Sequence, residues 1–167
     1  MKKILETKRT FLREITDDDF DALSKVISNK DGTPYENEYV LKWLNWCKSS
    51  YKEHGFGLWA VIDKTTNEMI GNMGVSMQMI DDDWRPEIGY HLRRDYHRQG
   101  IAKEVTKAIQ DYFFNHFDYD EVYSYMDVDN IASSKTAEAM GMTYLHLYET
   151  KHGMCKVYKI TRKEWKK

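Results

Sequence analysis

Cysteine, proline and long hydrophobic runs are scarce in this sequence. It has two residues each of cysteine and proline. Cys47 and Cys155 are too few for a disulfide framework, and neither belongs to a Cys-x-x-Cys pair that would indicate a redox motif or a zinc knuckle. No run reaches the ~18 apolar residues of a membrane span, and the apolar stretch near the N-terminus is too short for a signal peptide. We therefore expect reduced thiols and a cytoplasmic protein that has no membrane partner.

An excess of charge of either sign is also missing. The 25 lysine and arginine residues nearly balance the 27 aspartate and glutamate residues, which leaves a formal net charge of -2. Bulk electrostatic attraction to nucleic acid is therefore not expected. With 167 residues, 41% of them hydrophobic and 31% charged, and with no repeat or linker, the composition is typical of one globular domain over residues 1–167. The choice between a monomer and a homodimer stays open.

The spacing of apolar residues predicts a mixed α/β protein. Helical spacing is found over 36–54 and 100–117, and Gly55 is placed to end the first of these helices. Strand-like runs between residues 58 and 93 predict an antiparallel meander. The order is neither the strict alternation of a doubly wound fold nor a sandwich. In full, we expect helices over 16–28, 36–54, 100–117 and 131–140, and strands over 8–15, 58–63, 69–80, 87–93, 121–128, 142–148 and 155–160.

A basic loop containing Gly100 joins the strand over 87–93 to the helix that follows. Free backbone N–H groups at the start of a helix, together with the helix dipole, favour an anion. Gly100 and Ala102 have little side chain, so a phosphate can approach the backbone closely. The alternative is an ordinary turn glycine with a solvated basic rim. The other residues expected around an anion are Arg93, Arg94, His97, Arg98, Gln99, Ile101 and Lys103.

Two common phosphate-binding motifs do not account for this loop. No G-x-x-x-x-G-K-[ST] pattern occurs, which argues against a nucleotide triphosphatase. Residues 55–60 match G-x-G-x-x-A, but they precede a strand instead of joining a strand to a helix. The dinucleotide-binding interpretation therefore fails.

Five segments carry a family pattern: Glu87-Ile88-Gly89-Tyr90, Arg98-Gln99-Gly100-Ile101-Ala102, Asp129-Asn130 with Ser133, Gly141-Met142, and the closing residues 158–165. With them the sequence resembles the GCN5-related N-acetyltransferases (GNAT), and within them the branch of ribosomal-protein N-terminal acetyltransferases. The resemblance spans nearly the whole chain. It implies an α/β fold whose mostly antiparallel, six- to seven-stranded sheet splays apart between its fourth and fifth strands and is flanked by four helices. His97 departs from the family loop, which usually begins with arginine or glutamine.

The resemblance also implies acetyl-CoA as the cosubstrate and an amine as the acceptor. In the family, the loop before the long helix holds the pyrophosphate. The backbone of the fourth strand pairs with the pantetheine arm as an extra strand would. Asn130 is expected to cap the helix over 131–140 and to contact the same arm. The residues expected to bind acetyl-CoA are Tyr90, His91, Leu92, Arg93, His97, Arg98, Gln99, Gly100, Ile101, Ala102, Asn130 and Ser133.

Acetyl transfer to an amine needs the amine neutral, an oxyanion stabilised and a thiolate able to leave. We expect Glu87, at the start of the fourth strand, to be the general base. Asp127 and Asp129 are rivals for that role, and Glu87 is otherwise a surface glutamate. Ser133 matches a serine of the similar ribosomal-type enzymes and is expected to act as the acid or thiol-binding group, unless it is only a first-turn residue. Ala137 stands where other branches carry a catalytic tyrosine.

Aromatic residues suggest where an acceptor would bind. Tyr35 lies in an Asp-Gly-Thr-Pro loop and is expected to contact the acceptor. Trp84 is the other expected acceptor contact. It follows the acidic run 81–83, which would attract a cationic acceptor unless it is only a solvated turn. The resemblance places the acceptor surface on the first two helices and their loop, so aromatic residues there could line an acceptor pocket. Most of them are expected to belong to the core instead, and those at helical spacing to the core or an interface: Trp43, Trp46, Tyr51, Phe56 and Trp59.

No metal is expected, because His152 and Cys155 fall short of a four-ligand site. The leading interpretation is an acetyl-CoA-dependent N-acetyltransferase that acts on a protein N-terminal α-amine, an antibiotic or a small metabolite. A catalytically silent acyl-CoA-binding or regulatory module is the alternative. It would keep the anion loop while Glu87 and Ser133 were dispensable.

Overall fold

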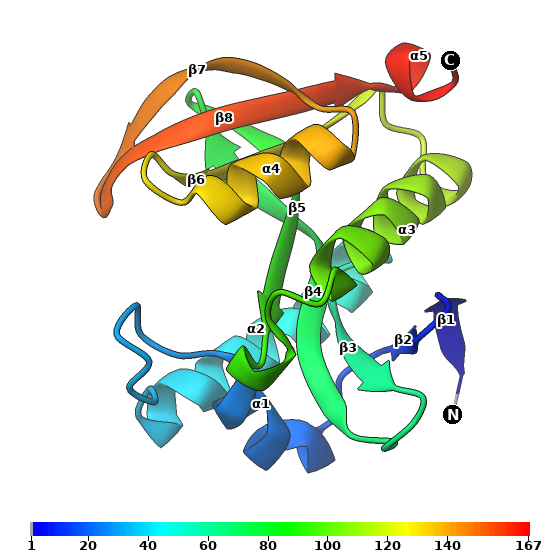
Figure 1. Cartoon of the computed structure of the whole chain (residues 1–167), viewed down its shortest axis with the longest axis vertical. Helices are drawn as coiled ribbons and strands as arrows, with labels where there is room; N and C mark the ends of the chain where they lie inside the picture. The colour runs from blue at the N-terminus through cyan, green and yellow to red at the C-terminus, as the bar shows by residue number, and fades with distance from the viewer. Residues whose placement is uncertain (1) are drawn as a thin grey trace.

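The computed structural model describes residues 2–167, and the strands in that range belong to one sheet (Figure 1). Within these residues the sheet has eight strands in the spatial order β1-β2-β3-β4-β5-β6-β8-β7. The strands are β1 (Lys3–Glu6), β2 (Thr10–Arg13), β3 (Leu58–Asp63), β4 (Met69–Ile80), β5 (Asp83–Leu92), β6 (Glu121–Asp127), β7 (Thr143–Thr150) and β8 (Gly153–Thr161). The helices are α1 (Phe20–Val26), α2 (Asn37–His54), α3 (Ile101–His116), α4 (Ile131–Ala139) and α5 (Arg162–Trp165), with 3-10 helices η1 (Asp17–Asp19) and η2 (Arg94–Tyr96).

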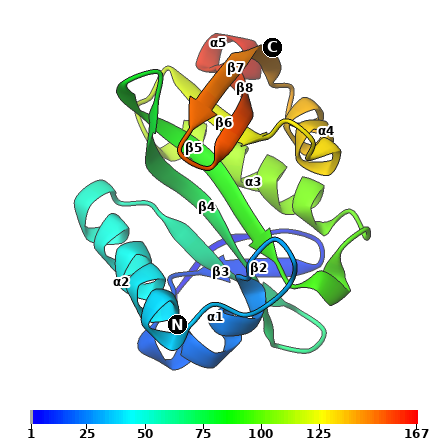
Figure 2. The ribbon, with the colours of Figure 1, turned by 90° about the vertical axis from the view of Figure 1, so that its left-hand side faces the viewer.

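The sheet opens between β5 and β6. These two strands are parallel and share one register pair in the described chain, Glu87 opposite Tyr123, whereas β4 pairs antiparallel with β5 over ten positions. Beyond that pair, β5 continues to Leu92 with no further register partner on β6. Figures 1 and 2 show the part of the sheet from β1 to β5 diverging from the part formed by β6, β7 and β8. The predicted splay is confirmed.

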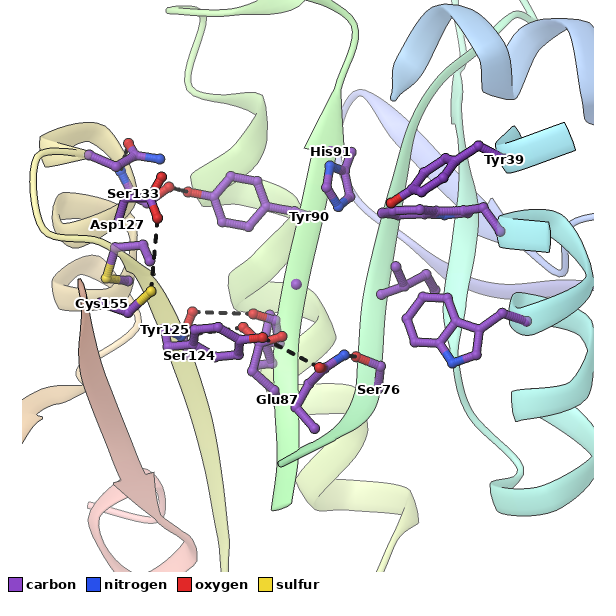
Figure 3. Close-up of a pocket in the computed structure, with 18 of the residues that line it drawn as sticks. Tyr39, Ser76, Glu87, Tyr90, His91, Ser124, Tyr125, Asp127, Ser133 and Cys155 are labelled. Carbon is purple, nitrogen blue, oxygen red and sulfur yellow. Dashed lines mark hydrogen bonds between the residues drawn. The ribbon is translucent and has the colours of Figure 1, made fainter. Parts of the chain in front are cut away.

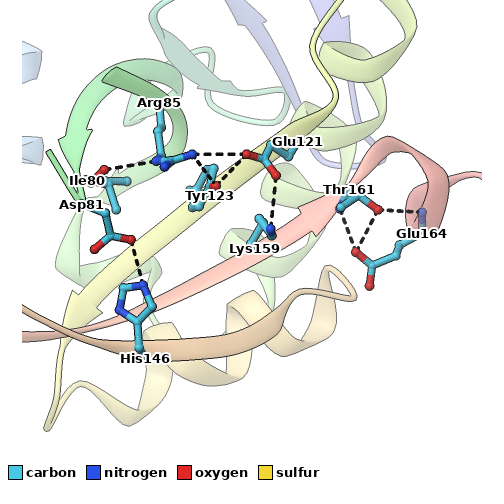
Figure 4. Close-up of polar contacts among 9 residues, drawn as sticks. All are labelled: Ile80, Asp81, Arg85, Glu121, Tyr123, His146, Lys159, Thr161 and Glu164. Atoms are coloured by element: carbon cyan, nitrogen blue, oxygen red, sulfur yellow. Dashed lines mark hydrogen bonds and ion pairs between the residues drawn. The ribbon is translucent and has the colours of Figure 1, made fainter. Parts of the chain in front are cut away.

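A polar cluster ties the two parts of the sheet together at the closed end of the splay (Figure 4). Arg85 on β5 donates hydrogen bonds to the Tyr123 hydroxyl at 2.8 Å and to Glu121 Oε1 at 3.3 Å, both on β6. Lys159 Nζ on β8 lies 3.2 Å from Glu121 Oε2. Because this end is fixed, the opening lies toward the other end of β5, where Leu92 leads into the basic loop.

Each face of the sheet carries its own hydrophobic core. On one face, α1 and α2 pack against Leu58, Ala60 and Ile62 of β3. On the other face, α3 and α4 pack against alternate residues of the same strand, including Val61. This alternation is what a strand buried on both faces requires. Figure 2 shows α2 and α3 on opposite sides of the sheet.

Glycines mark the predicted limits of the two long helices. Gly55 follows α2 with φ of 80°, and Gly100 precedes α3 with φ of 79°, both in the left-handed region. The helix expected over 16–28 is divided into η1 and α1, with a capping box between Thr16 and Asp19 at its start. No helix within residues 2–167 is long and apolar enough to cross a membrane.

Three elements differ from the prediction. β1 adds an eighth strand by pairing with β2, and its four residues are too few to give an alternating signal. β5 begins at Asp83 because the acidic run forms a tight hairpin turn, in which Asp81 and Asp82 have φ of 55° and 61°. Aspartate tolerates this conformation better than most residues. A fifth helix, the one-turn α5, follows β8.

Candidate active site

Two cavities meet at the splay between β5 and β6. The first, here called the sheet cavity, has a volume of about 630 Å³ and lies between α2, β5, β6 and β8. The second, the loop cavity, has a volume of about 760 Å³ and lies between the segment after α1, the basic loop and α4. The residues that line both cavities are Tyr90, His91, Asn130 and Ser133. A ligand that fills the loop cavity therefore reaches the sheet cavity at these four residues.

The loop cavity ends at the first turn of α3. Gly100 and Arg98 both have left-handed backbone angles, with φ of 79° and 63°. A Cβ at position 100 would meet one atom within 4 Å, the Arg9 Nη2 at 3.7 Å, so the backbone is open there. The first N–H groups of α3 have no partner within the helix by their position. Basic side chains on the wall of this cavity are Lys30, Arg94, Arg98, Lys103 and Lys135.

Arg9, which precedes the basic loop by 90 residues in the sequence, contacts the loop and fixes its position. Its Nε donates to Glu104 Oε1 at 3.0 Å, and its Nη1 donates to the Gln99 carbonyl oxygen at 2.8 Å. The Arg9 backbone N–H also donates to Glu104 Oε2 at 3.1 Å. Sequence reasoning missed Arg9 because 95 residues separate it from Glu104.

The floor of the sheet cavity is one face of β5. Glu87, Gly89 and His91 alternate along the strand and so share that face. A Cβ at position 89 would lie 3.2 Å from Glu87 Oε1, so the glycine keeps the space between the two titratable side chains empty. Figure 3 shows the side chains of Glu87 and His91 on β5, with Tyr39 on one side of the cavity and Tyr125 on the other.

Glu87 is the buried carboxyl group of this site. It is 7% exposed and has no ion pair with a described residue. Its Oε2 accepts one long hydrogen bond, from the Tyr125 backbone N–H at 3.4 Å. Burial penalises the charged form, and this raises the pKa of Glu87 from 4.5 to about 8. A surface position for Glu87 is therefore wrong.

The rival carboxylates have different surroundings. Asp127 lines the sheet cavity, but its Oδ2 forms an ion pair with Lys30 Nζ at 2.5 Å, and its Oδ1 accepts from Cys155 Sγ at 3.8 Å. Asp129 is exposed and lines neither cavity. Glu87 is thus the carboxyl group that faces the cavity without a cation beside it.

Ser133 lies where the two cavities join. Its backbone N–H donates to Asn130 Oδ1 at 3.2 Å, so Asn130 caps α4 as predicted. The Ser133 hydroxyl accepts a hydrogen bond from the Tyr90 hydroxyl at 2.9 Å. Figure 3 shows this contact between β5 and α4. The serine hydroxyl therefore lies at the boundary between the two cavities and not on the outer side of α4.

Comparison with known proteins places this chain in a family. Residues 9–143 match the family model described as Acetyltransferase (GNAT) domain. The chain belongs to the GNAT acetyltransferase family. It is 33% identical over 149 residues to YkkB of Bacillus subtilis, with 86% of this chain and 87% of YkkB covered. It is 31% identical over 148 residues to YoaA of the same organism, which is named an N-acetyltransferase, with 84% and 83% covered.

Solved structures share the fold. A GNAT-family acetyltransferase from Bordetella pertussis matches with a TM-score of 0.84 at 16% identity, covering 95% of this chain and 99% of that one. RimL, a ribosomal L7/L12 alpha-N-protein acetyltransferase solved with coenzyme A, matches with a TM-score of 0.76 at 17% identity, covering 96% and 98%. The predicted family, fold class and N-acetyltransferase activity are confirmed, with eight strands in place of six or seven.

GNAT enzymes use acetyl-CoA, and the loop cavity fits it. The open backbone at Gly100 and the surrounding cations suit the pyrophosphate, and the free edge of β5 suits the amide groups of the pantetheine arm. Arg93 and Gln99 do not line the cavity: Arg93 Nε donates to Asp95 Oδ1 at 2.7 Å, and Gln99 Nε2 donates to the Asp95 carbonyl oxygen at 3.1 Å. The binding roles of the individual residues stay predictions.

The His91 side chain was missed, because only its backbone was assigned a role. Its ring lies edge-on against the ring of Trp43, with 4.8 Å between centroids. Trp43 is itself held by its Nε1, which donates to Oδ1 of the buried Asn72 at 2.9 Å. Burial lowers the pKa of His91 to about 4, so the imidazole is neutral at neutral pH.

Neither predicted acceptor contact lines the sheet cavity. Tyr35 is half-buried against Tyr39, with ring centroids 4.3 Å apart. Trp84 is 61% exposed and lines a third cavity of about 470 Å³, which also includes Trp46. Within residues 2–167, no group of three or more His, Cys, Asp or Glu side chains is arranged to hold a metal ion.

The aromatic residues are divided between the core and the sheet cavity. Phe56 and Trp59 are buried in the core as expected, and Trp43 packs against the core while it also lines the cavity. Trp46 and Tyr39 are exposed and line the cavity wall. The spacing 39, 43 and 46 is the available signal, because residues so spaced share one helix face. Spacing alone does not tell a cavity wall from a core.

Proposed function

We propose that this enzyme transfers the acetyl group from acetyl-CoA to a primary amine by direct attack in a ternary complex. The acetyl donor would occupy the loop cavity and the acceptor would occupy the sheet cavity. The observation that carries the proposal is that the two cavities meet at a serine hydroxyl, Ser133, and that the sheet cavity holds a buried carboxyl group, Glu87.

Glu87 is proposed to accept the proton that the acceptor amine loses as its nitrogen bonds to the acetyl carbon. Its pKa of about 8 is close to the ~7.7–8.0 of an α-amine, so that transfer is nearly balanced. An ordinary lysine amine, at ~10.4, would hold its proton more tightly by about 3 kcal/mol. The site therefore favours an amine of low pKa.

Ser133 is proposed to hydrogen-bond the sulfur as the thioester bond breaks and the thiolate leaves. A thiol of pKa ~8.5 leaves readily, so this contact supplies orientation more than acid strength. Tyr90 fixes the serine hydroxyl through the 2.9 Å hydrogen bond. The products are the N-acetylated amine and CoA. Glu87 releases the amine's proton to solvent, and the CoA thiolate takes up a proton from solvent.

Cys155 is a candidate nucleophile for a covalent route, because it lines the sheet cavity. Its thiol is buried on the wall of the sheet cavity beside Asp127. Burial, together with the neighbouring carboxylate, raises the pKa of this thiol. A thiol kept protonated is a poor nucleophile, which supports direct attack by the amine.

The test separates an enzyme from a silent acyl-CoA-binding module. Acetyl-CoA at 100 times its dissociation constant should add ~2.7 kcal/mol of stability, which corresponds to roughly 5–10 °C in Tm. An enzyme also releases free thiol when an amine is added, and Glu87→Gln and Ser133→Ala should slow that release while Tm still responds to CoA. A Tm response to CoA without thiol release for any amine would contradict the proposed transfer.

A further inference from the structure

The wall of the sheet cavity that α2 forms is aromatic. Tyr39 and Trp46 on α2 are 45% and 39% exposed, although large aromatic side chains are usually more deeply buried. Trp43 lies between them and is held rigidly by Asn72 and His91. The facing wall includes Tyr125 of β6. A flat or bulky apolar group can therefore be enclosed by rings on two sides.

The charges that face this cavity leave one free carboxyl group, Glu87, which has no ion pair with a described residue. It is neutral below about pH 8 because of its burial, and in the ionised form that the proposed transfer uses it can partner one ammonium group. Asp127 already has a cation, Lys30, at 2.5 Å. Lys42 adds a positive charge to the wall, and the His91 imidazole is neutral. A ligand carrying several ammonium groups would have to bury charges without partners, which is strongly unfavourable.

We infer that the acceptor is a primary amine whose amino group is its single positive charge and whose neighbouring group is aromatic or bulky and apolar. This inference rests on the acetyl transfer proposed above and narrows its acceptor. It disfavours polyamines and antibiotics with many amino groups. The same chemistry occurs in a free small amine and in the N-terminal residue of a peptide, and the experiment distinguishes these two sources.

The experiment compares acceptors that share one amine and differ in its neighbouring group. Thiol release from acetyl-CoA is measured with phenylalanine amide, alanine amide and spermidine, and with the peptide Phe-Ala-Ala amide. Phenylalanine amide should exceed alanine amide in kcat/KM by about 10- to 100-fold, and spermidine should be the poorest. Higher kcat/KM for the peptide than for phenylalanine amide would identify a peptide N-terminus as the source, and lower kcat/KM would identify a small amine.

Variants of the cavity wall test whether the rings cause the preference. Trp46→Ala and Tyr39→Ala should each reduce the preference for phenylalanine amide over alanine amide, mainly through KM. Leu41→Ala is the matched control, because Leu41 is on the same helix, is 49% exposed and does not line the cavity. Lys30→Met, which leaves Asp127 unpaired, should raise kcat/KM for spermidine. Tm with and without CoA verifies that each variant is folded.

Three outcomes would overturn the inference. Equal kcat/KM for the phenylalanine and alanine amides would show that the aromatic wall does not select the acceptor. Thiol release that is fastest with spermidine would refute the charge argument and leave the proposed transfer standing. No release with any of these amines, with an intact Tm response to acetyl-CoA, would refute this inference and the proposed transfer together.

Discussion

Replacing Glu87 with glutamine should have opposite effects on activity and on stability. The substitution keeps the shape of a side chain that is 7% exposed and removes its ability to ionise. In the wild type the buried carboxyl group has a pKa of about 8, against 4.5 when it is not buried. The folded protein therefore holds this proton more tightly than the unfolded chain does.

Because the pKa of Glu87 is higher in the folded protein than in the unfolded chain, the wild type loses stability as the pH rises. Stability from the protonated group is fully present below pH ~4.5 and is lost as the pH rises through about 8. At about 1.4 kcal/mol per pH unit, the interval from 4.5 to about 8 corresponds to a loss on the order of 5 kcal/mol above pH 8. Glu87→Gln avoids this loss, so its Tm should exceed that of the wild type by roughly 10–20 °C at pH 9 and approach it near pH 5.

Activity should move in the other direction. The wild-type kcat/KM should rise with pH to a plateau above about pH 8, as Glu87 loses its proton. In Glu87→Gln the rate should fall by about 100-fold or more, and the pH dependence that remains should be that of the acceptor amine alone, at its own pKa of ~7.7–8.0. Calorimetric melts and thiol-release rates between pH 5 and 9 measure both effects. Glu138→Gln is the control, because Glu138 is exposed on α4 and lines neither cavity. A Tm difference between Glu87→Gln and wild type that does not change with pH would refute the reasoning.

Three further substitutions test other contacts. Gly100→Leu should abolish the Tm response to CoA, because the leucine side chain would fill the space beside the open backbone and because φ of 79° is unfavourable for leucine. A Tm response that is retained in thermal melts would contradict the proposed pyrophosphate site. Arg9→Gln should raise KM for acetyl-CoA several-fold through loss of the Glu104 contact, with little change in KM for the amine, as bisubstrate kinetics would show. Trp43→Phe should lower the free energy of unfolding by about 1–3 kcal/mol in urea titrations, because Asn72 Oδ1 loses its indole donor, and an unchanged value would show that the bond contributes nothing.

The long elements and the basic loop could be predicted from local sequence. Gly55 and Gly100 set the limits of α2 and α3, and both have the left-handed angles that glycine permits. β1 was missed because four residues that gain order only by pairing with β2 leave no periodic signal. The acidic run forms the turn that was one of its two expected readings, but the start of β5 at Asp83 was not predicted, because aspartate is uncommon in strands.

The parts of the site that could be predicted are the residues that belong to a local sequence motif. Glu87 and Ser133 were found through the family resemblance, and the structure places Glu87 in the sheet cavity and Ser133 where the two cavities meet. The aromatic wall needed the docking of α2 against the opened sheet, which spacing along the helix does not specify. The support of the loop by Arg9 likewise depends on a contact across 95 residues.

The most direct test of the account is the initial-rate pattern with acetyl-CoA and phenylalanine amide varied together, with the product identified by mass. Direct attack in a ternary complex predicts intersecting double-reciprocal lines and an N-acetylated amide formed in step with free thiol. Parallel lines, with acetyl recovered on a protein side chain such as Cys155, would contradict it and would indicate a covalent route.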